Sequence, residues 1–157
     1  MIDVLVLDPD DWRLWRDMRL AALREARGVF ASSLADWSGP GDTEARWRAR
    51  LGDVPFNALL RQAGRAVGMV SATDPGSHDV VELISLWVSP TARGHGVGDA
   101  AVTAVTDWAH QHHLGCPVGL WVRTDNTRAQ ALFLRNGFMA LGRAVDGEHR
   151  MTRPPVR

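Results

Sequence analysis

Residues 88–98 read Val88-Ser89-Pro90-Thr91-Ala92-Arg93-Gly94-His95-Gly96-Val97-Gly98. This segment combines the end of an expected strand, a short loop and the glycine-rich start of an expected helix. Glycines at alternate positions let the backbone approach a ligand closely, and the first N–H groups of a helix are unpaired donors with partial positive charge. Arg93 adds a full positive charge. The segment therefore predicts a phosphate-binding loop, and the alternative is a tight strand-to-helix turn without a ligand.

Two widely used nucleotide-binding motifs do not match this loop. The dinucleotide-binding pattern Gly-x-Gly-x-x-Gly needs a third glycine one residue later than Gly98. The P-loop pattern needs a Lys, and all 18 residues counted as Lys or Arg are Arg. Tyr is absent as well. Mechanisms that use a Lys Schiff base or a Tyr general acid are therefore excluded.

Composition narrows the class of protein further. The 157 residues fit a single domain, 1–157, with a packed core. The 18 basic and 18 acidic residues balance, which gives no long-range reason to expect nucleic acid or an anionic membrane as partner. No apolar run approaches a membrane span and no secretion signal opens the chain, so we expect a cytoplasmic location. A homodimer is the default expectation for a soluble assembly.

Hydrophobic periodicity and turn residues predict an α/β domain with a mixed sheet. The expected order is strand, helix, helix, three strands, helix, strand, helix and two strands. The corresponding ranges are 2–7, 10–26, 43–51, 57–62, 65–73, 80–88, 94–113, 118–122, 127–136, 138–145 and 149–152. Residues 28–43 are expected to form a loop-rich segment.

A second motif lies downstream and consists of Asn126, Ala129, Leu132, Phe133, Gly137 and Phe138. Together the two segments resemble the GNAT superfamily of N-acetyltransferases. In that family the acetyl-CoA loop has the form Arg/Gln-x-x-Gly-x-Gly/Ala, matched by Arg93, Gly96 and Gly98. The second signature, Asn-x-x-Ala-x-x-Leu-Tyr-x-x-x-Gly-Phe, is matched except that Phe133 replaces the Tyr. The resemblance extends to the strand Val67-Gly68-Met69-Val70 and to the amphipathic first helix, so it covers nearly the whole chain.

The resemblance implies a GNAT fold, in which a mixed, mostly antiparallel sheet of about seven strands carries four helices and is splayed between the fourth and fifth strands. It implies acetyl-CoA as cosubstrate. Leu86, Trp87 and Val88 would pair with pantetheine, and Asn126, Ala129 and Phe133 would line its other side. The N–H groups of Gly94, His95, Gly96, Val97, Gly98 and Asp99 would hold the pyrophosphate, with the His95 side chain touching a CoA phosphate.

Two catalytic roles are also expected. The N–H near Val88 would stabilise the oxyanion of the tetrahedral intermediate. Glu82 resembles the glutamate that serves some family members as general base, directly or through water. Its even spacing predicts that it shares a face of the strand with Ile84, Leu86 and Val88. An acid among apolar neighbours is either a tuned catalyst or a paired structural carboxylate, and both readings stay open.

Phe133 departs from the family pattern in a way that affects the chemistry. Family members often carry a Tyr here that protonates the leaving thiolate, and Phe has no proton to give. Because the chain contains no Tyr, three routes remain: protonation by water, protonation by another side chain, or unassisted departure of the thiolate.

Metal chemistry is not expected. His110, His112 and His113 lack the i, i+4 spacing that places two ligands on one helix face. Cys116, the single cysteine, excludes a cysteine-rich metal cluster and is interpreted as an inert thiol near a strand start.

Three functions fit these observations. The first is transfer of an acetyl group from acetyl-CoA to a primary amine of a small molecule, by direct attack in a ternary complex. The second is N-acetylation of a peptide or protein, and the third is non-catalytic sensing of acyl-CoA, which the missing Tyr favours. We expect Phe30, Ser32, Trp37 and Trp121 near the acceptor, with Trp87 close by.

Overall fold

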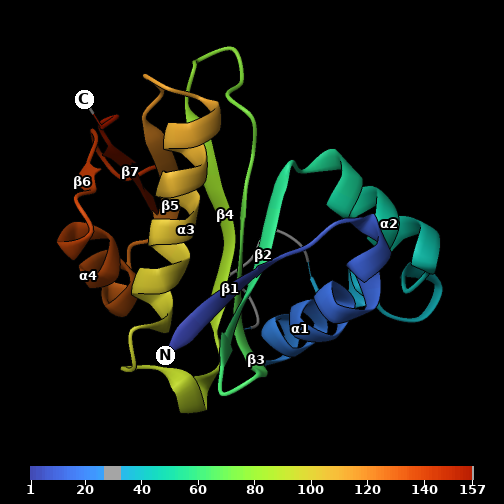
Figure 1. The fold of residues 1–157 in the computed structure, drawn as a ribbon. Coiled ribbons are helices and arrows are strands. Elements are labelled where there is room, and N and C mark those ends of the chain that lie inside the picture. Colours follow the sequence, from blue (N-terminus) through green and yellow to red (C-terminus); the bar gives the residue numbers. More distant parts are fainter. Residues whose placement is uncertain (27–32, 157) are drawn as a thin grey trace.

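The computed structural model describes residues 1–26 and 33–156. Its elements follow the order expected from the sequence (Figure 1). They are β1 (Ile2–Val6), α1 (Trp12–Glu25), α2 (Glu44–Asp53), β2 (Phe56–Gln62), β3 (Arg65–Ala72), β4 (Val81–Val88), α3 (Val97–His112), β5 (Val118–Arg123), α4 (Thr127–Arg135), β6 (Met139–Ala140) and β7 (Glu148–Arg153). None of the helices in these described ranges combines the length and apolar character that a membrane span requires.

The strands form one seven-stranded sheet in the order β1-β2-β3-β4-β5-β7-β6. Neighbouring strands are antiparallel except β4 and β5, which run parallel. The α/β class and the mixed, mostly antiparallel sheet of seven strands are therefore confirmed, and the parallel pair fits the expected splay between the fourth and fifth strands.

Two boundaries differ from the sequence expectation. The third helix begins at Val97 rather than at Gly94, because Gly94 and Gly96 adopt φ values of 81° and 84° that a right-handed helix does not contain. The strand expected over 138–145 shortens to Met139–Ala140. Gly142, at φ 72°, turns the chain out of the extended conformation there.

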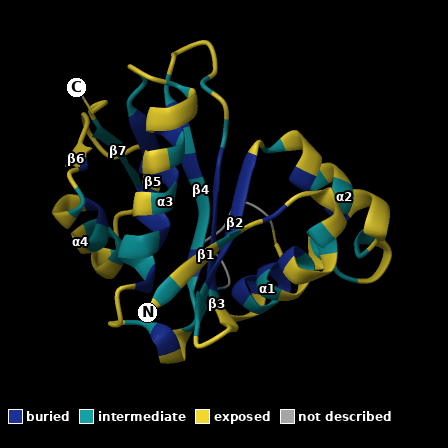
Figure 2. Ribbon diagram, in the orientation of Figure 1, coloured by how far each residue is buried: buried dark blue, intermediate teal, exposed yellow. Residues whose placement is uncertain are grey.

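Apolar side chains form a core on each face of the sheet. Figure 2 shows buried residues along the central strands and in the helices that cover them. Adjacent strand residues alternate between the two, so Leu60 and Val70 face α3 whereas Leu59 and Met69 face α1 and α2. We call the α3 side the first face and the α1 and α2 side the second face.

A β-bulge in β4 interrupts this alternation. Ile84 pairs with Ser71 and Trp87 pairs with Met69. Between these two pairs β4 advances by three residues and β3 by only two. Ser85 lies within the bulge and has a φ of 57°. The extra residue reverses the side-chain parity of β4 beyond it.

The bulge overturns one sequence expectation. Leu86 and Val88 pack on the first face together with Leu83, whereas Trp87 packs on the second face. Glu82 directly precedes Leu83 and therefore lies on the second face. The prediction that Glu82 shares a face with Leu86 and Val88 is wrong.

Asp42 connects α1 to α2. Its carboxylate accepts hydrogen bonds from Nε and Nη2 of Arg16, at 2.8 and 2.6 Å, and from Nε1 of Trp47 at 2.8 Å. The hydrogen bonds from Arg16, and then the one from Trp47, lower the pKa of Asp42 to about 2. Ionised Asp42 therefore stabilises the packing of the two helices.

We expect Asp42→Asn to lower the thermal midpoint at neutral pH and the difference from wild type to shrink in acid. The pKa of this group is lower in the folded than in the unfolded chain, so its contribution is complete above about pH 4. The contribution disappears as the pH falls to about 2. Thermal unfolding followed by circular dichroism measures both midpoints across this window.

Asp17→Asn is the matched control, because Asp17 contacts the same Arg16 at 2.9 Å but is 71% exposed. We expect a smaller effect from this variant. A deficit of Asp42→Asn that stays constant from neutral pH to the acid limit would contradict the role of the charge.

Candidate functional site

The centre of the sheet is splayed between β4 and β5. The two strands pair only at Val81 with Val118 and at Glu82 with Gly119 among the described residues. Beyond these pairs β4 continues to Val88 and β5 to Arg123. The exposed strand edges between them could pair with an extended ligand.

The backbone of Val88 is directed into this splay. Ser89 N–H donates to Val67 O at 2.8 Å, and Trp87 pairs with Met69 across the same two strands. Since hydrogen-bonding direction alternates along an antiparallel strand, the N–H and C=O of Val88 face away from β3. Its C=O accepts from Arg93 Nε at 3.1 Å.

The glycine-rich loop follows directly and leads into α3. Gly94 and Gly96 have positive φ values, and a Cβ added at either one would meet no atom within 4 Å. Gly96 caps the helix, and the first intrahelical hydrogen bond runs from Ala100 N–H to Gly96 O at 3.0 Å. The N–H groups of the first turn are thus free of helical acceptors beside open space, where an anion is favoured. His95 is exposed, whereas Val97 is buried and anchors the turn.

Gly98 has a different function from the other two glycines. A Cβ at Gly98 would lie 2.9 Å from Leu132 Cδ2, so this glycine permits the close approach of α4 to α3. The neighbouring Asp99 carboxylate accepts from Arg135 Nε at 2.9 Å and from Asn136 Nδ2 at 2.9 Å. The Arg135 guanidinium is the main cause of the lowered pKa of Asp99. The side chain of Asp99 is therefore committed to α4.

Arg93 lies between the loop and α1. Its Nη2 contacts Glu25 Oε2 at 3.0 Å, and the same oxygen accepts from Trp87 Nε1 at 2.8 Å. These contacts, the one from Trp87 first, lower the pKa of Glu25. Arg93, whose charge the sequence analysis assigned to a phosphate, is thus paired with the carboxylate of Glu25. Its hydrogen bond to Val88 O also holds the end of β4 in place.

The second motif lies on α4, the helix that follows β5, and at the end of that helix. Asn126 caps α4 by accepting from Ala129 N–H at 3.2 Å. Ala129 packs, partly buried, against the core on the first face of the sheet. Phe133 is buried in that core, and its ring centroid is 5.7 Å from that of Phe138. The ring of Phe133 therefore serves as packing in this structure.

Glu82 is paired on the second face. Its carboxylate accepts two hydrogen bonds from the Arg150 guanidinium, from Nη1 at 2.6 Å and from Nη2. The side chains of Glu82 and Arg150 are 32% and 17% exposed. Arg150 belongs to β7, so its side chain crosses β5 to reach β4. A bidentate pair of this kind favours the interpretation of Glu82 as a paired structural carboxylate.

Gly119 makes this crossing possible. A Cβ at Gly119 would lie 2.5 Å from Arg150 Nη2 and 2.9 Å from Val80 Cγ1. Sequence reasoning missed both Gly119 and Arg150. An isolated glycine inside the expected strand 118–122 was the available signal, since it often marks a close approach.

We expect Gly119→Ala to displace Arg150 from Glu82 and to lower the free energy of unfolding by about 1 to 3 kcal/mol, the usual cost of overpacking. Urea unfolding measures the loss. Gly52→Ala in α2 is the matched control, because a Cβ there meets nothing within 4 Å. Its stability should be unchanged or slightly higher, since Ala favours helix. Equal losses in the two variants would contradict the crowding at Gly119.

The expected acceptor residues are dispersed. Trp121 lies beside Arg150, whose guanidinium carbon is 5.4 Å from the Trp121 ring centroid, and it is 51% exposed. Trp37 instead packs on Trp47 at 4.4 Å under the guanidinium of Arg46. Phe30 and Ser32 lie outside the described residues.

Glu82 and Val88 are six residues apart on β4, up to about 20 Å along an extended strand. The Glu82 carboxylate therefore does not reach an atom held at the Val88 N–H. Of the two routes by which Glu82 was expected to act as base, direct transfer does not fit this spacing, and transfer through water would need a chain of several water molecules.

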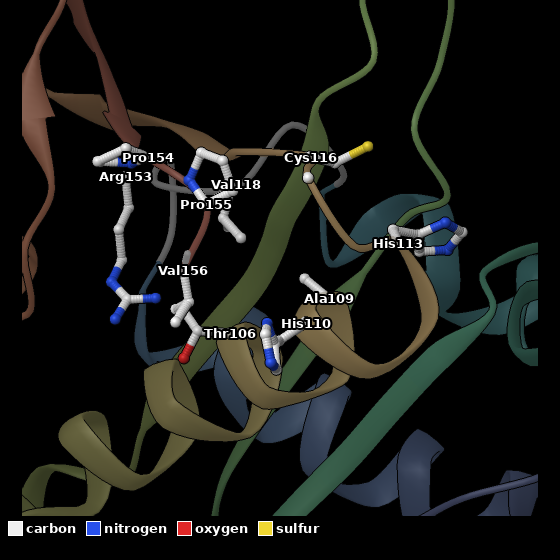
Figure 3. A pocket seen from close by; sticks show the side chains of 11 residues that line it. Thr106, Ala109, His110, His113, Cys116, Val118, Arg153, Pro154, Pro155 and Val156 are labelled. Atoms are coloured by element: carbon white, nitrogen blue, oxygen red, sulfur yellow. The ribbon is translucent and has the colours of Figure 1, made fainter.

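A small pocket lies near the C-terminal end of α3 (Figure 3). His110, His113 and Cys116 lie around it, and His113 Nε2 is 3.0 Å from Asp74 Oδ1. Within the described part of the chain no three His, Cys, Asp or Glu side chains gather in a metal-binding arrangement. The pocket lies away from the glycine loop.

Comparison with known proteins adds independent evidence. The model of the acetyltransferase (GNAT) family matches residues 15–138. Mycothiol acetyltransferase of Jonesia denitrificans is 36% identical over 93 residues, which are 55% of this chain and 27% of that protein. The matched part thus spans about a quarter of the length of this relative.

Solved structures show the same fold at low identity. A GNAT acetyltransferase from Streptococcus pneumoniae superposes with a TM-score of 0.75 at 18% identity, over 99% of this chain and 100% of that one. PaiA N-acetyltransferase from Thermoplasma acidophilum, in complex with coenzyme A, gives 0.75 at 12% over 98% and 99%. Spermidine N-acetyltransferase from Vibrio cholerae, in complex with CoA and spermine, gives 0.71 at 15% over 98% and 95%.

Proposed function

Because this chain belongs to the acetyltransferase (GNAT) family, we propose that it transfers an acetyl group from acetyl-CoA to a primary amine of a small molecule, by direct attack in a ternary complex. One observation carries the proposal. The open, positive-φ glycines at the start of α3 lie at the end of β4, next to the splay with β5. The candidate phosphate site and the unpaired edge of β4 are therefore adjacent, so one extended ligand could bind to both.

Acetyl-CoA would use both features. The N–H groups from Gly94 to Asp99 would bind the pyrophosphate. The edge of β4 at Leu86 and Val88 would pair with the pantetheine amides, and Asn126, Ala129 and Phe133 would border them on the α4 side. Trp87 would contribute indirectly, since its backbone pairs with β3.

Acetyl transfer requires a neutral amine. The amine lone pair attacks the thioester carbon, the carbonyl electrons form an oxyanion held by the Val88 N–H, and the C–S bond then breaks to release the CoA thiolate. The proton that remains in excess on the attacking nitrogen passes to water or to the departing thiolate, which leaves the neutral amide. The ammonium proton would pass through water to Glu82, which must first be released in part from Arg150. Phe133 supplies no proton, so the thiolate leaves unassisted or is protonated by water.

The proposal is tested by incubating the protein with acetyl-CoA and a library of primary amines. We expect release of free thiol in equal amount with an acetylated amine detected by mass spectrometry. If only peptides are acetylated, the acceptor is a polypeptide and the proposed small-molecule acceptor is wrong.

The pairing of Glu82 with Arg150 specifically favours a second candidate, a non-catalytic acyl-CoA sensor, because it leaves the carboxylate engaged. Calorimetry with acetyl-CoA separates the two. Tight binding without thiol release for any amine would support the sensor and contradict the enzyme.

A further inference from the structure

A cation lies over the second face of the sheet without a carboxylate partner. Arg50 of α2 donates to Asn57 Oδ1 at 2.8 Å, to Ser71 Oγ at 3.1 Å and to Ser85 Oγ at 3.3 Å. Its three acceptors are neutral and lie on β2, on β3 and in the bulge of β4. Among the described residues no carboxylate is within ion-pairing distance of Arg50.

Two further side chains of α1 lie in the same region. Trp15 and Arg19 are one helical turn apart and therefore share a face of α1. The Arg50 guanidinium carbon is 4.9 Å from the Trp15 ring centroid. Trp15 is fully buried, and its Nε1 has no hydrogen-bond partner among the described residues.

Burial lowers the pKa of Arg50 to about 10, the nearby charge of Arg19 adds to this shift, and the charge of Asp53 opposes it. Burial also lowers the pKa of Arg19 to about 10. Both guanidinium groups are consequently charged at neutral pH. The α1 and α2 layer thus concentrates positive charge and an unused N–H donor where desolvation makes an anion favourable.

This cluster borders the splay. Ser85 precedes Val88 by three residues, up to about 10 Å along β4. Arg50 and Ser85 are both partly exposed, so these two side chains are accessible to a ligand, whereas Trp15 and Arg19 are buried. A molecule on the second face could contact Arg50 with one end and reach the thioester with the other.

We propose that Arg50, which lies near the positive charge of Arg19, binds an oxyanion of the amine acceptor, a carboxylate or a phosphate ester several bonds from the reacting amine. The inference rests on the proposed acetyl transfer and specifies its substrate class. A guanidinium matches either oxyanion.

Matched acceptor pairs test the inference. We would compare kcat/KM for γ-aminobutyrate and its amide, for ε-aminocaproate and its amide, and for phosphoethanolamine and ethanolamine. We expect the anionic member of at least one pair to be preferred by about tenfold or more, the usual scale for a specific charged contact. The preferred pair identifies carboxylate or phosphate.

Arg50→Gln should remove this preference by raising KM for the anionic acceptor, with little change for its neutral partner. Arg48→Gln on the same helix is the control, since Arg48 pairs with Asp10 and Glu44 on the surface. Circular dichroism and acetyl-CoA calorimetry establish that each variant is folded. Equal acetylation of neutral and anionic acceptors by wild type would overturn the inference and leave the proposed function standing.

If no amine is acetylated, the anion site is tested by binding. Acetate and inorganic phosphate should raise the thermal midpoint of wild type and of Gly96→Asp, but not of Arg50→Gln. Stabilisation that disappears only in Gly96→Asp would assign the anion to the α3 loop and contradict a site at Arg50, as would an absence of stabilisation in all three proteins.

Discussion

Gly96→Asp should weaken acetyl-CoA binding by about 100-fold or more, because it places a carboxylate beside the pyrophosphate at the positive end of α3. Gly96 caps this helix at a φ of 84°. The space around it is open, so the side chain would meet no atom of the protein, although the positive φ strains any L residue there, and it would occupy the position expected for the phosphates. Isothermal titration calorimetry with acetyl-CoA measures the loss.

Gly96→Asn separates charge from conformation. Asn and Asp have nearly the same shape, and both tolerate a left-handed backbone better than other residues do. We expect Asn to weaken binding much less than Asp. Unchanged affinity in the Asp variant would remove the phosphate-loop interpretation, and equal losses in both variants would assign the effect to backbone geometry.

Glu82→Gln should lower kcat by about 100-fold while acetyl-CoA affinity is retained, if Glu82 accepts the proton of the amine. The substitution keeps the shape of the side chain and removes its basicity. It also leaves the Arg150 guanidinium without its anionic partner. Stopped assays of thiol release, together with calorimetry, separate the loss of chemistry from a loss of binding.

The variant Arg150→Gln and the double variant distinguish catalysis from structure. If Glu82 is the base, Arg150→Gln keeps the carboxylate and much of the activity, whereas the double variant stays inactive. If the pair is only structural, Glu82→Gln and Arg150→Gln lose stability to a similar extent, and the double variant recovers it. Full activity of Glu82→Gln would identify Glu82 as a structural carboxylate.

Local signals predicted most of the fold. Asp8 and Pro9 mark the start of the first helical region, and the structure shows a capping box between Asp8 and Asp11 there. The turn at Ala63 and Gly64 joins β2 to β3, with positive φ values of 52° and 78°. Such features depend on a few neighbouring residues, so a single sequence reveals them.

The bulge at Ser85 was not predictable in this way. A serine at positive φ has no strong local signature, and here its hydroxyl accepts from Arg50, a residue 35 positions away. The error propagated, because one extra residue in β4 moved Glu82 to the face opposite Leu86 and Val88. Tertiary contacts therefore determine the face of β4 on which Glu82 lies, which simple alternation along the strand predicted wrongly.

The residues of the candidate site differ in the same way in whether the sequence could predict them. The glycine loop is contiguous in sequence, so its residues could be named in advance. Glu82 and Arg150 are 68 residues apart and meet only because β5 carries Gly119 between them. Arg50 likewise reaches β4 from α2 across two strands. Pairings of this kind arise from the order of strands in the sheet, which periodicity does not report.

A crystal structure of the protein with CoA tests the central claim most directly. We expect the pyrophosphate to accept hydrogen bonds from N–H groups between Gly94 and Asp99, and pantetheine to pair with β4 in the splay beside β5. Phosphates bound elsewhere, for example at Arg50, or pantetheine lying outside the splay, would contradict it.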